Sequence, residues 1–575
     1  MGGRPGNQAA RPVSKGRMRK VLALLVLSVA CASAPINKLD VAALALADAR
    51  IREGCYDCLL EARDIYQRVA VGKARPIVLA HLFEAEVLIY ARERELSLDA
   101  EATASRARAA ALGAELPPAF EAARYLAIVD TVPGDQYGWP RAQVIQFRRQ
   151  IAPINVQATA EAAWLTDEPA APAPAAKPAK NAPAATSLRL RQPARQYLVA
   201  TLDCVFDPAA RPGGPRPMRA GELPPAQQPV RTTAPTPPAA TAASPAVPLV
   251  TYRRATCGRN NIAALEQVRA EVPRFVETSY FLAKIAVPTV KDNGGTKARQ
   301  QIAEFYTRFP KSSSATYLSG YLTQLASGCK VALAFYEQTI ALKPLHEDGM
   351  LGRTMCLSVT KRTDEAIASA THMITLRPVL YNYVDAYYWR AWNYHQLKKL
   401  AEARADINEA KSLAVTANIL TLAGVIEHDQ DDLSPSEKDL LAARGLADGE
   451  RNCIAANYLG SVYFKKKEWK NSGQAFEWAM QCFQLGVLDS KAGLAAMLGR
   501  TDLDPEWKAQ QIANFETAIK EDEEQSYMAA FNSANHYAAV DEVAKVRTLI
   551  EIAAKAPSIA DKVAVIREWL KNKIE

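Results

Sequence analysis

The chain has 575 residues, of which 49% are hydrophobic and 23% are charged, so it is long enough for several domains and can bury a sizeable core. Its formal net charge is +9, but six basic residues with no acid among them stand in the first 20 positions. The rest of the chain is close to neutral. Bulk charge therefore gives no reason to expect a nucleic-acid partner, and we expect none.

The start of the chain has the layout of an export signal. Residues 15–20 are basic, residues 21–30 form a short apolar run, and small residues and Cys31 follow. The run is shorter than the roughly 20 residues that a membrane-spanning helix needs. It therefore predicts a signal peptide over residues 1–34, with Met18 as an alternative start of translation.

Residues 27–31, Leu-Ser-Val-Ala-Cys, resemble a bacterial lipobox. The resemblance implies that Cys31 carries lipid and becomes the new N-terminus, so that the protein is anchored to a membrane without spanning it. Ala32 follows in place of Asp, which by analogy with Gram-negative lipoproteins implies a periplasmic protein held at the outer membrane. Ordinary cleavage after Ala32 is the alternative, and it would release an exported protein without an anchor.

Eight further cysteines are consistent with an oxidising compartment. They are Cys55, Cys58, Cys204, Cys257, Cys329, Cys356, Cys453 and Cys482. Cys55 and Cys58 have CxxC spacing, which is compatible with zinc, a redox pair or a local structural pair. A zinc site needs four ligands, and the sequence has no second CxxC motif. A thioredoxin-like site needs a βαβ context. We therefore favour a local structural pair.

The strongest signal is an internal repeat. Three prolines follow one another at intervals of 34 residues, and an alanine stands twelve residues before each of them. These are Pro310, Pro344 and Pro378, with Ala298, Ala332 and Ala366. The period resembles the tetratricopeptide repeat, whose pattern is W-x2-L-G-x2-Y, then A-x3-F, then P. Further matches are Gly320, Tyr336, Ala391, Tyr394, Ala403, Ile407, Ala410, Leu459, Gly460, Tyr463, Phe476 and Ala479.

The resemblance implies an all-α solenoid of helical hairpins, in which small residues lie where two helices approach closely and proline ends the second helix. The register places repeat starts near Ser279, Ser313, Glu347, Val384, Asn418 and Cys453. We expect the 418 repeat to be degenerate, with the acidic turn Asp-Gln-Asp-Asp at residues 429–432 replacing the usual tight connection. Residues 487–520 are expected to form a weaker final repeat, followed by a capping helix over residues 561–575.

Composition divides the rest of the chain. Residues 35–166 are Ala-rich and predict a smaller, repeat-like helical block. Residues 167–250 are rich in Pro and Ala and predict a semi-extended linker, although residues 196–206 are apolar enough to dock. The array follows over residues 251–520, and capping helices over residues 521–575.

The register also brings cysteines together. Cys453 opens a first helix and Cys482 closes the second helix of the same hairpin, so they lie at neighbouring ends. A pairing of Cys329 with Cys356 follows less strictly from the same geometry. Cys204 and Cys257 flank the longer Pro-rich stretch, and a bridge between them would pin its ends together. All three pairings are hypotheses.

Motifs for catalysis are missing from the sequence. It has no GxxxxGK[ST], GxGxxG, HExxH or GxSxG motif, and its six histidines form no ligand pair at helical spacing. We therefore expect a non-catalytic protein without a cofactor or metal.

The resemblance implies a binding surface, because the first helices of such repeats line a concave groove. The groove positions in this register are Tyr317, Tyr321, Gln324, Asp385, Tyr388, Trp392, His395, Gln396, Asn457, Ser461, Phe464 and Lys465. Tyr and Trp at such positions favour a binding hot spot, and the alternative is that Tyr388 and Trp392 pack between repeats.

These observations predict a cell-envelope scaffold that holds a protein or peptide segment in the groove. The alternative is a lipoprotein that binds a glycan or another small solute. An enzyme with its site in the N-terminal block or the linker is a third possibility, which no motif supports.

Overall fold

The computed structural model describes most of the chain, in ranges separated by gaps. The described residues are 38–71, 75–132, 158, 160–166, 189–206, 247–257, 262–287, 296–376, 383–446, 452–501 and 505–573. All regular structure within these ranges is helical, as the repeat pattern predicts. Cys31 and most of the expected linker lie outside them, and the side chains of Cys204 and Cys257 are not described either.

The N-terminal block is a series of helices in which each packs against the next. Its helices are α2 Lys38–Glu53, α3 Tyr56–Val69, α4 Arg75–Glu95, α5 Asp99–Glu115, the short η2 Pro118–Phe120 and α6 Ala122–Thr131. Most of α4 is buried, including charged residues such as Glu86 and Arg92. Its end is a tight turn in which Ser97 has a φ of 54°.

Cys55 and Cys58 form a disulfide at the start of α3, with their Cα atoms 4.9 Å apart. Both residues are buried in a cluster that includes Tyr252 and Phe275, which come from a later part of the chain. The prediction of a local structural pair is confirmed.

Three helices connect this block to the array. They are α8 Gln192–Phe206, α9 Pro248–Cys257 and α10 Ile262–Glu271. The segment expected to dock lies in α8, which packs against α9 and α2 and buries Tyr197 and Leu198.

A buried ion pair fixes the N-terminal block to the array. Arg92 of α4 is fully buried, and its guanidinium lies 2.9 Å from the Glu277 carboxylate and 4.0 Å from the centre of the Tyr252 ring. Glu277 also accepts a hydrogen bond from the backbone N–H of Tyr56 (2.6 Å). Because removing one partner of a buried pair leaves an uncompensated charge, these contacts hold the two parts in one arrangement.

Six helical hairpins follow. They are α11 Glu277–Ala286 with α13 Thr296–Arg308, α14 Ser313–Ser327 with α15 Cys329–Leu342, α16 Glu347–Val359 with α17 Thr363–Thr375, α18 Tyr383–Gln396 with α19 Leu400–Leu413, α20 Ala417–Asp429 with α21 Leu433–Gly445, and α22 Cys453–Lys465 with the first part of α23 Trp469–Gly499. Each first helix begins within two residues of its predicted start. The small residues lie at close approaches, since a Cβ on Gly460 would come within 2.7 Å of the Phe476 ring.

The turn inside these hairpins is the same in most repeats, and one prediction about it is wrong. Lys361, Lys398, Asp431 and Lys467 all adopt a φ of 57–61°. In each turn the following N–H bonds to a carbonyl five residues back, as in Lys399 to Tyr394 (2.9 Å). This is a Schellman ending. The acidic segment 429–432, Asp-Gln-Asp-Asp, therefore keeps the tight turn that it was expected to replace.

Two predicted disulfides are confirmed. Cys329 and Cys356 join neighbouring hairpins, with Cα atoms 4.8 Å apart, and Cys453 and Cys482 join the helices of one hairpin at 5.3 Å. Cys482 lies where the second helix of an ordinary repeat would end.

The expectation of a separate weak repeat at residues 487–520 is wrong. Helix α23 continues past Cys482 to Gly499, and α24 Pro505–Ala538 returns beside it as a helix of 34 residues. The part that projects, residues 483–501 and 505–525, is a two-helix extension of the stack, which we call the arm. Ala, Leu and Met residues recur along α23 without a proline, so its helical periodicity is not broken.

A seventh repeat, missed in the sequence, follows the arm. It combines the last turns of α24 with α25 Val543–Ala553, and Asp541 takes the usual turn conformation with a φ of 57°. Tyr537 and Ala553 are both buried and are spaced as Tyr463 and Ala479 are. The short η5 Pro557–Ile559 and α26 Ala560–Lys571 complete the described chain.

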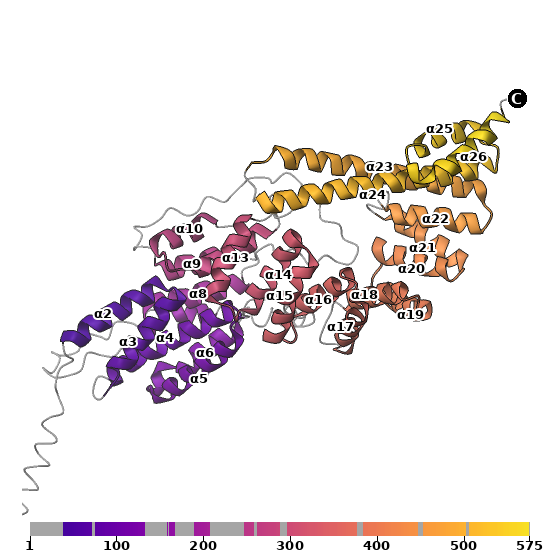
Figure 1. Ribbon diagram of the computed structural model, residues 1–575. Coiled ribbons are helices and arrows are strands. Elements are labelled where there is room, and N and C mark those ends of the chain that lie inside the picture. The colour runs from indigo at the N-terminus through magenta and orange to yellow at the C-terminus, as the bar shows by residue number, and fades with distance from the viewer. Residues whose placement is uncertain are drawn as a thin grey trace, which may run out of the picture.

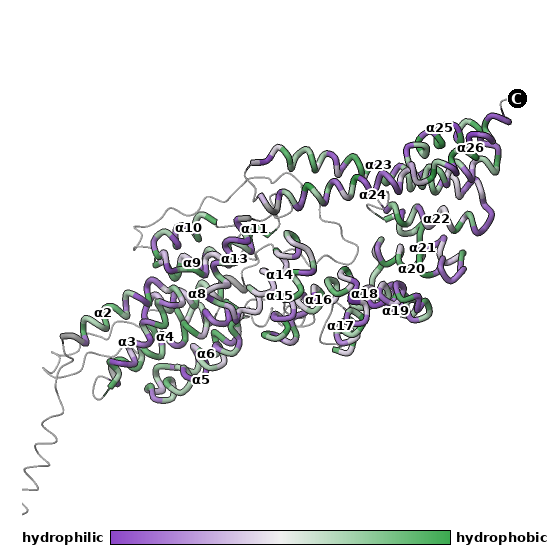
Figure 2. Tube along the Cα trace, viewed as in Figure 1, coloured by the Kyte–Doolittle hydropathy of each residue, from purple (hydrophilic) through white to green (hydrophobic). Residues whose placement is uncertain are grey.

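The array curves, and the arm returns across it toward α14 (Figure 1). Apolar and polar residues alternate along the helices (Figure 2), as expected where one side of each helix packs on its neighbours. No helix among the described residues is both long and apolar enough to cross a membrane.

Candidate functional site on the inner face of the array

The first helices lie on the inner side of the curve. Along the array, α14 contacts α16, α16 contacts α18, α18 contacts α20, and α20 contacts α22. In Figure 1 these helices follow one another along the side of the array that faces the arm. We call the surface that they turn toward the arm the inner face.

Tyr317 and Tyr321 lie together on α14. Their rings stack with centroids 6.4 Å apart, and Tyr317 also lies 5.0 Å from the ring of His346. Both tyrosines are half-buried. Gln324, one turn further on, accepts a hydrogen bond from the Tyr336 hydroxyl (2.5 Å). The two tyrosines therefore form a supported aromatic surface with part of each ring accessible.

The predicted residues of α18 are placed differently from one another. Trp392 is 36% exposed, whereas Tyr388 is half-buried and packs against the apolar cluster between α18 and α20. His395 is buried, with 8% of its surface exposed. Packing between repeats thus buries much of the Tyr388 side chain, but it leaves the Trp392 side chain accessible.

The predicted residues of α22 lie near the root of the arm. Phe464 is 47% exposed, and one side of its ring stacks on His536 with centroids 5.1 Å apart. Lys465 donates hydrogen bonds to the Asp431 carboxylate (2.6 Å) and the His428 carbonyl (3.0 Å). Asn457 lies two turns earlier on the same helix and is half-buried.

A chain of hydrogen bonds joins three first helices, and sequence reasoning missed its centre. His395 of α18 lies 2.9 Å from Asp429 of α20, His428 lies 3.1 Å from the same carboxylate, and the other nitrogen of His428 lies 2.9 Å from Ser461 of α22. The sequence pattern does not select His428 and Asp429, because their repeat matches the consensus poorly. Their place at the end of a first helix, equivalent to that of His395, was the available signal.

Asp429 is the acceptor at the centre of this chain. Burial alone would raise the pKa of Asp429, but the hydrogen bonds from His395 and His428 outweigh it and lower that pKa below its ordinary value. An ionised Asp429 accepts hydrogen bonds only, so each histidine donates to it. The second ring nitrogen of His428 is left to share a hydrogen bond with the Ser461 hydroxyl (2.9 Å).

Ser461, His428 and Asp429 stand in the order of a hydrolase triad, but Ser461 lies in the middle of α22. The backbone N–H groups around it are used in the helix and so cannot form a main-chain oxyanion hole. Within the described part of the chain no group of three or more His, Cys, Asp or Glu residues is arranged to hold a metal. The arrangement is suited to fixing the three helices and presenting polar groups.

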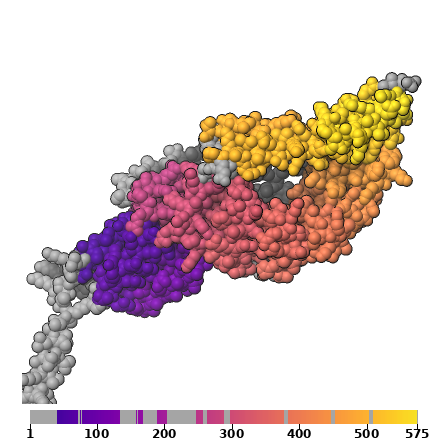
Figure 3. Space-filling view, viewed as in Figure 1, coloured from indigo at the N-terminus to yellow at the C-terminus, as the bar shows by residue number. Residues whose placement is uncertain are grey.

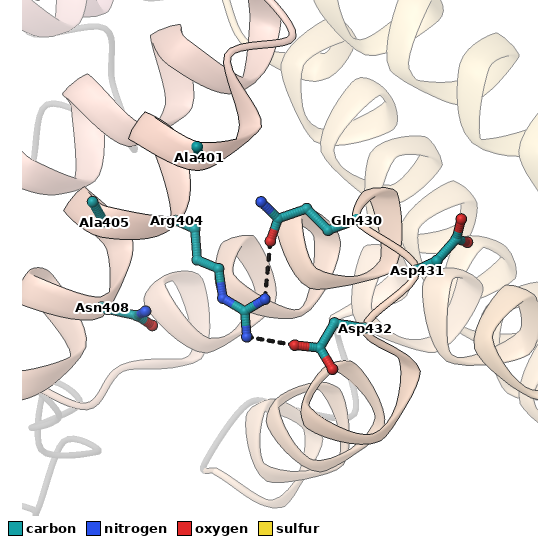
Figure 4. Close-up of a pocket in the computed structure, with 7 residues that line it drawn as sticks. All are labelled: Ala401, Arg404, Ala405, Asn408, Gln430, Asp431 and Asp432. Atoms are coloured by element: carbon teal, nitrogen blue, oxygen red, sulfur yellow. Dashed lines mark hydrogen bonds and ion pairs between the residues drawn. The ribbon is translucent and has the colours of Figure 1, made fainter.

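A shallow depression lies elsewhere, between α19 and the turn from α20 to α21 (Figure 4). Arg404 crosses it and donates to Gln430 (3.0 Å) and Asp432 (2.6 Å). Nearby, burial and the charge of Asp439 raise the pKa of Glu427 to about 7. Because the Arg404 guanidinium is already paired with these residues, it links two repeats and is not available to bind an anionic ligand in the depression.

No protein-family model and no curated protein matches the sequence. Similar solved structures include YrrB, described as a TPR protein with an unusual peptide-binding site, at 15% identity and a TM-score of 0.26 over 32% of this chain and 91% of that one. The yeast Tom70 structure is 12% identical, with a TM-score of 0.30 over 85% of this chain and 97% of that one. Cut9 with Hcn1, an assembly of the APC/C, is 11% identical, with a TM-score of 0.35 over 90% and 76%.

The fold is identified by the repeats of this chain. Hairpin after hairpin has the same tight turn, and residues at the repeat positions, such as Ala332, Tyr336 and Gly460, are buried where neighbouring helices meet. The fold is therefore an all-α solenoid of helical hairpins that resemble tetratricopeptide repeats.

Proposed function

We propose that this protein is a non-catalytic scaffold that holds an extended segment of a protein or peptide against the inner face of the array. The observation that carries the proposal is the exposure of Trp392 (36%) and Phe464 (47%), large aromatic side chains on α18 and α22. The hydrogen-bonded chain through His428 and Asp429 lies between them. Aromatic anchors next to polar groups match the composition of binding hot spots.

The charges on this surface favour an uncharged or weakly charged segment. Asp429 accepts hydrogen bonds from two histidines and lies 3.6 Å from the Lys398 ammonium, and Lys465 is paired with Asp431, so charges of both signs have local partners. An extended peptide satisfies such a surface because its backbone supplies donors and acceptors while apolar side chains cover the aromatic rings.

We further propose that the protein acts in the cell envelope, as a periplasmic lipoprotein held at the outer membrane through Cys31. The lipobox-like sequence at residues 27–31 and the three disulfides among the described residues support this proposal. Labelling of cells with an alkyne fatty acid tests the anchor. Label in wild type and none in Cys31→Ser is expected, and equal label in both would contradict lipidation.

The partner-binding proposal is tested by crosslinking and affinity capture from native envelopes. Wild type is compared with Trp392→Ala/Phe464→Ala and with the control Val565→Ala, whose side chain is 67% exposed on α26. A protein retained by wild type and the control but reduced at least tenfold with the double variant is expected. Retention of an oligosaccharide instead, lost in the same variant, would replace the protein partner by a glycan.

A further inference from the structure

The arm converts the inner face from an open groove into an enclosed opening. Helix α24 contacts α14, which stands four hairpins earlier in the curve than α23. In Figure 3 the arm lies across the array and an opening remains between the two. The boundary of this opening consists of the first helices from α14 to α22 on one side and the arm on the other.

The contact that closes this opening is small and lies at the tip of the arm. Ala326 of α14 and Met497 of α23 are buried together, at 6% and 8% exposure, with Ile512 and Phe515 of α24 packed beside them. Leu498, the next residue, is 56% exposed. A contact of this size is far smaller than a stable protein interface, so it can open without unfolding the chain.

The arm itself is stiff. Its helices approach closely, because a Cβ on Gly493 would come within 2.6 Å of the Phe515 ring and one on Gly486 within 2.5 Å of Asp522. Lys491 and Glu523 form an ion pair across it (2.7 Å). The two helices therefore move together.

The root of the arm is fixed to the last repeats. The Cys453–Cys482 disulfide holds α23 at the point where the arm begins. Further along, Ser533 donates a hydrogen bond to the carbonyl of Gly473 (2.7 Å), and His536 lies 2.8 Å from Ser472. A stiff element that is fixed at its root and lightly held at its tip can act as a strap.

We propose that the arm is a strap that closes the inner face into a hoop around an extended polypeptide, and that the Ala326–Met497 contact is its latch. This inference rests on the proposed function, since it names how the same surface holds its partner. The locally neutralised charges of the inner face select a polypeptide of low charge. A closed hoop encircles an internal segment of a polypeptide whose chain continues on both sides. An open groove does not encircle its ligand in this way.

The latch is tested on the protein alone by measuring distances between spin labels. The labels are attached through keto amino acids at the exposed positions Val331 of α15 and Glu516 of α24, so that the native cysteines are untouched. Wild type is expected to give one narrow, short distance distribution, and Met497→Asp a broad one shifted to longer distances. Leu498→Asp is the matched control and is expected to resemble wild type. An unchanged distribution in Met497→Asp, or a broad one in wild type, would overturn the latch.

The hoop is tested by locking the latch with a disulfide in Ala326→Cys/Met497→Cys. The probe is dephosphorylated β-casein, an unfolded chain, either free or with a folded domain fused to each end. We expect the locked protein to bind the free chain but to associate at least tenfold more slowly with the capped chain, and reduction to restore the rate. Equal association of both chains would overturn the hoop. Failure of wild type to bind either chain would remove the polypeptide partner, and with it the proposed function, while leaving the latch measurement intact.

Discussion

His536 shows how one residue links the inner face to the arm. It is buried, stacks on Phe464 at 5.1 Å and lies 5.8 Å and 5.4 Å from the rings of Trp469 and Phe476. This burial lowers the pKa of His536 to about 4 from an ordinary value of 6.5. The root of the arm therefore requires a neutral imidazole, because protonation would place a charge among aromatic rings.

This pKa predicts an acid-sensitive stability. Between pH 6.5 and pH 4 the unfolded chain binds a proton at His536 that the folded chain does not, so the free energy of unfolding falls as the pH falls. Urea unfolding at pH 7.5 and pH 5 should show a loss about 2 kcal/mol larger in wild type than in His536→Gln. His372→Gln, which changes an exposed histidine of α17, is the control. The same loss in His536→Gln as in wild type would show that His536 is not the responsible group.

At this scale the sequence predicted the side chains of the site better than their contacts. Register alone selects Trp392 and Phe464, because each residue of a first helix has a fixed direction relative to the curve. Register alone does not show that Tyr388 is less exposed than Trp392, because the exposure of Tyr388 depends on how α18 packs against α20. The His428–Asp429 pair needed the three-dimensional contacts, since its partners His395 and Ser461 lie 34 and 33 residues away along the chain.

At the scale of the helix and turn, the recurring Schellman ending uses unfavourable residues. Lys361 and Lys467 have a φ of 61°, although they carry a Cβ and glycine is the residue that adopts this conformation without strain. Both side chains are exposed, so they contribute little packing that would offset the strain. Tertiary packing of the hairpins holds these turns in place.

Replacing either lysine by glycine should therefore stabilise the protein. For Lys361→Gly and Lys467→Gly we expect the free energy of unfolding to rise by about 0.5–1 kcal/mol each, measured by urea denaturation. Lys438→Gly, at an exposed position inside α21, is the matched control and should lower it by about 1 kcal/mol. Destabilisation by all three changes would mean that the turns are not strained by the lysine side chains.

Repeat starts, helix order and two disulfide pairings were predictable because a TPR hairpin has nearly fixed dimensions. The position of the arm was not predictable from the sequence, because the helices of the arm continue the period of the repeats on either side. Residues 483–499 keep an apolar stripe, so sequence alone reads them as the start of another hairpin. The signal for the true seventh repeat was the spacing between Tyr537 and Ala553, which matches earlier repeats.

At the scale of the whole molecule, the closure of the inner face by the arm depends on many repeats together and is not a property of any single repeat. The latch joins Ala326 to Met497, and contacts this distant in sequence leave no periodic signature. Curvature accumulates over the hairpins between them, so a small change in each would move the tip of the arm away from α14. The inserted arm therefore depends on an accurately curved array, which the hydrogen-bonded chain across α18, α20 and α22 and the two inter-helix disulfides help to fix.

If the arm is an insertion into an otherwise continuous solenoid, the repeats on its two sides should not need it. We predict that replacing residues 484–524 by the sequence of the connection at residues 343–346, which joins α15 to α16, gives a folded protein. The buried cluster that unites α22, α23, α24, α25 and α26 consists of residues outside the deleted segment, such as Ala479, Tyr537 and Ile550. Its unfolding free energy should therefore change by less than about 1 kcal/mol.

Hydrogen exchange measures this outcome helix by helix. Amides of α25 and α26 should keep their protection in the shortened protein, because their packing against the remaining part of α24 is unchanged. Loss of protection there would show that the arm supports the end of the array and is not a separable strap. Retained protection together with loss of the enclosed opening would assign the arm to closure of the hoop alone, and the inner face of the shortened protein would then be open to a capped chain.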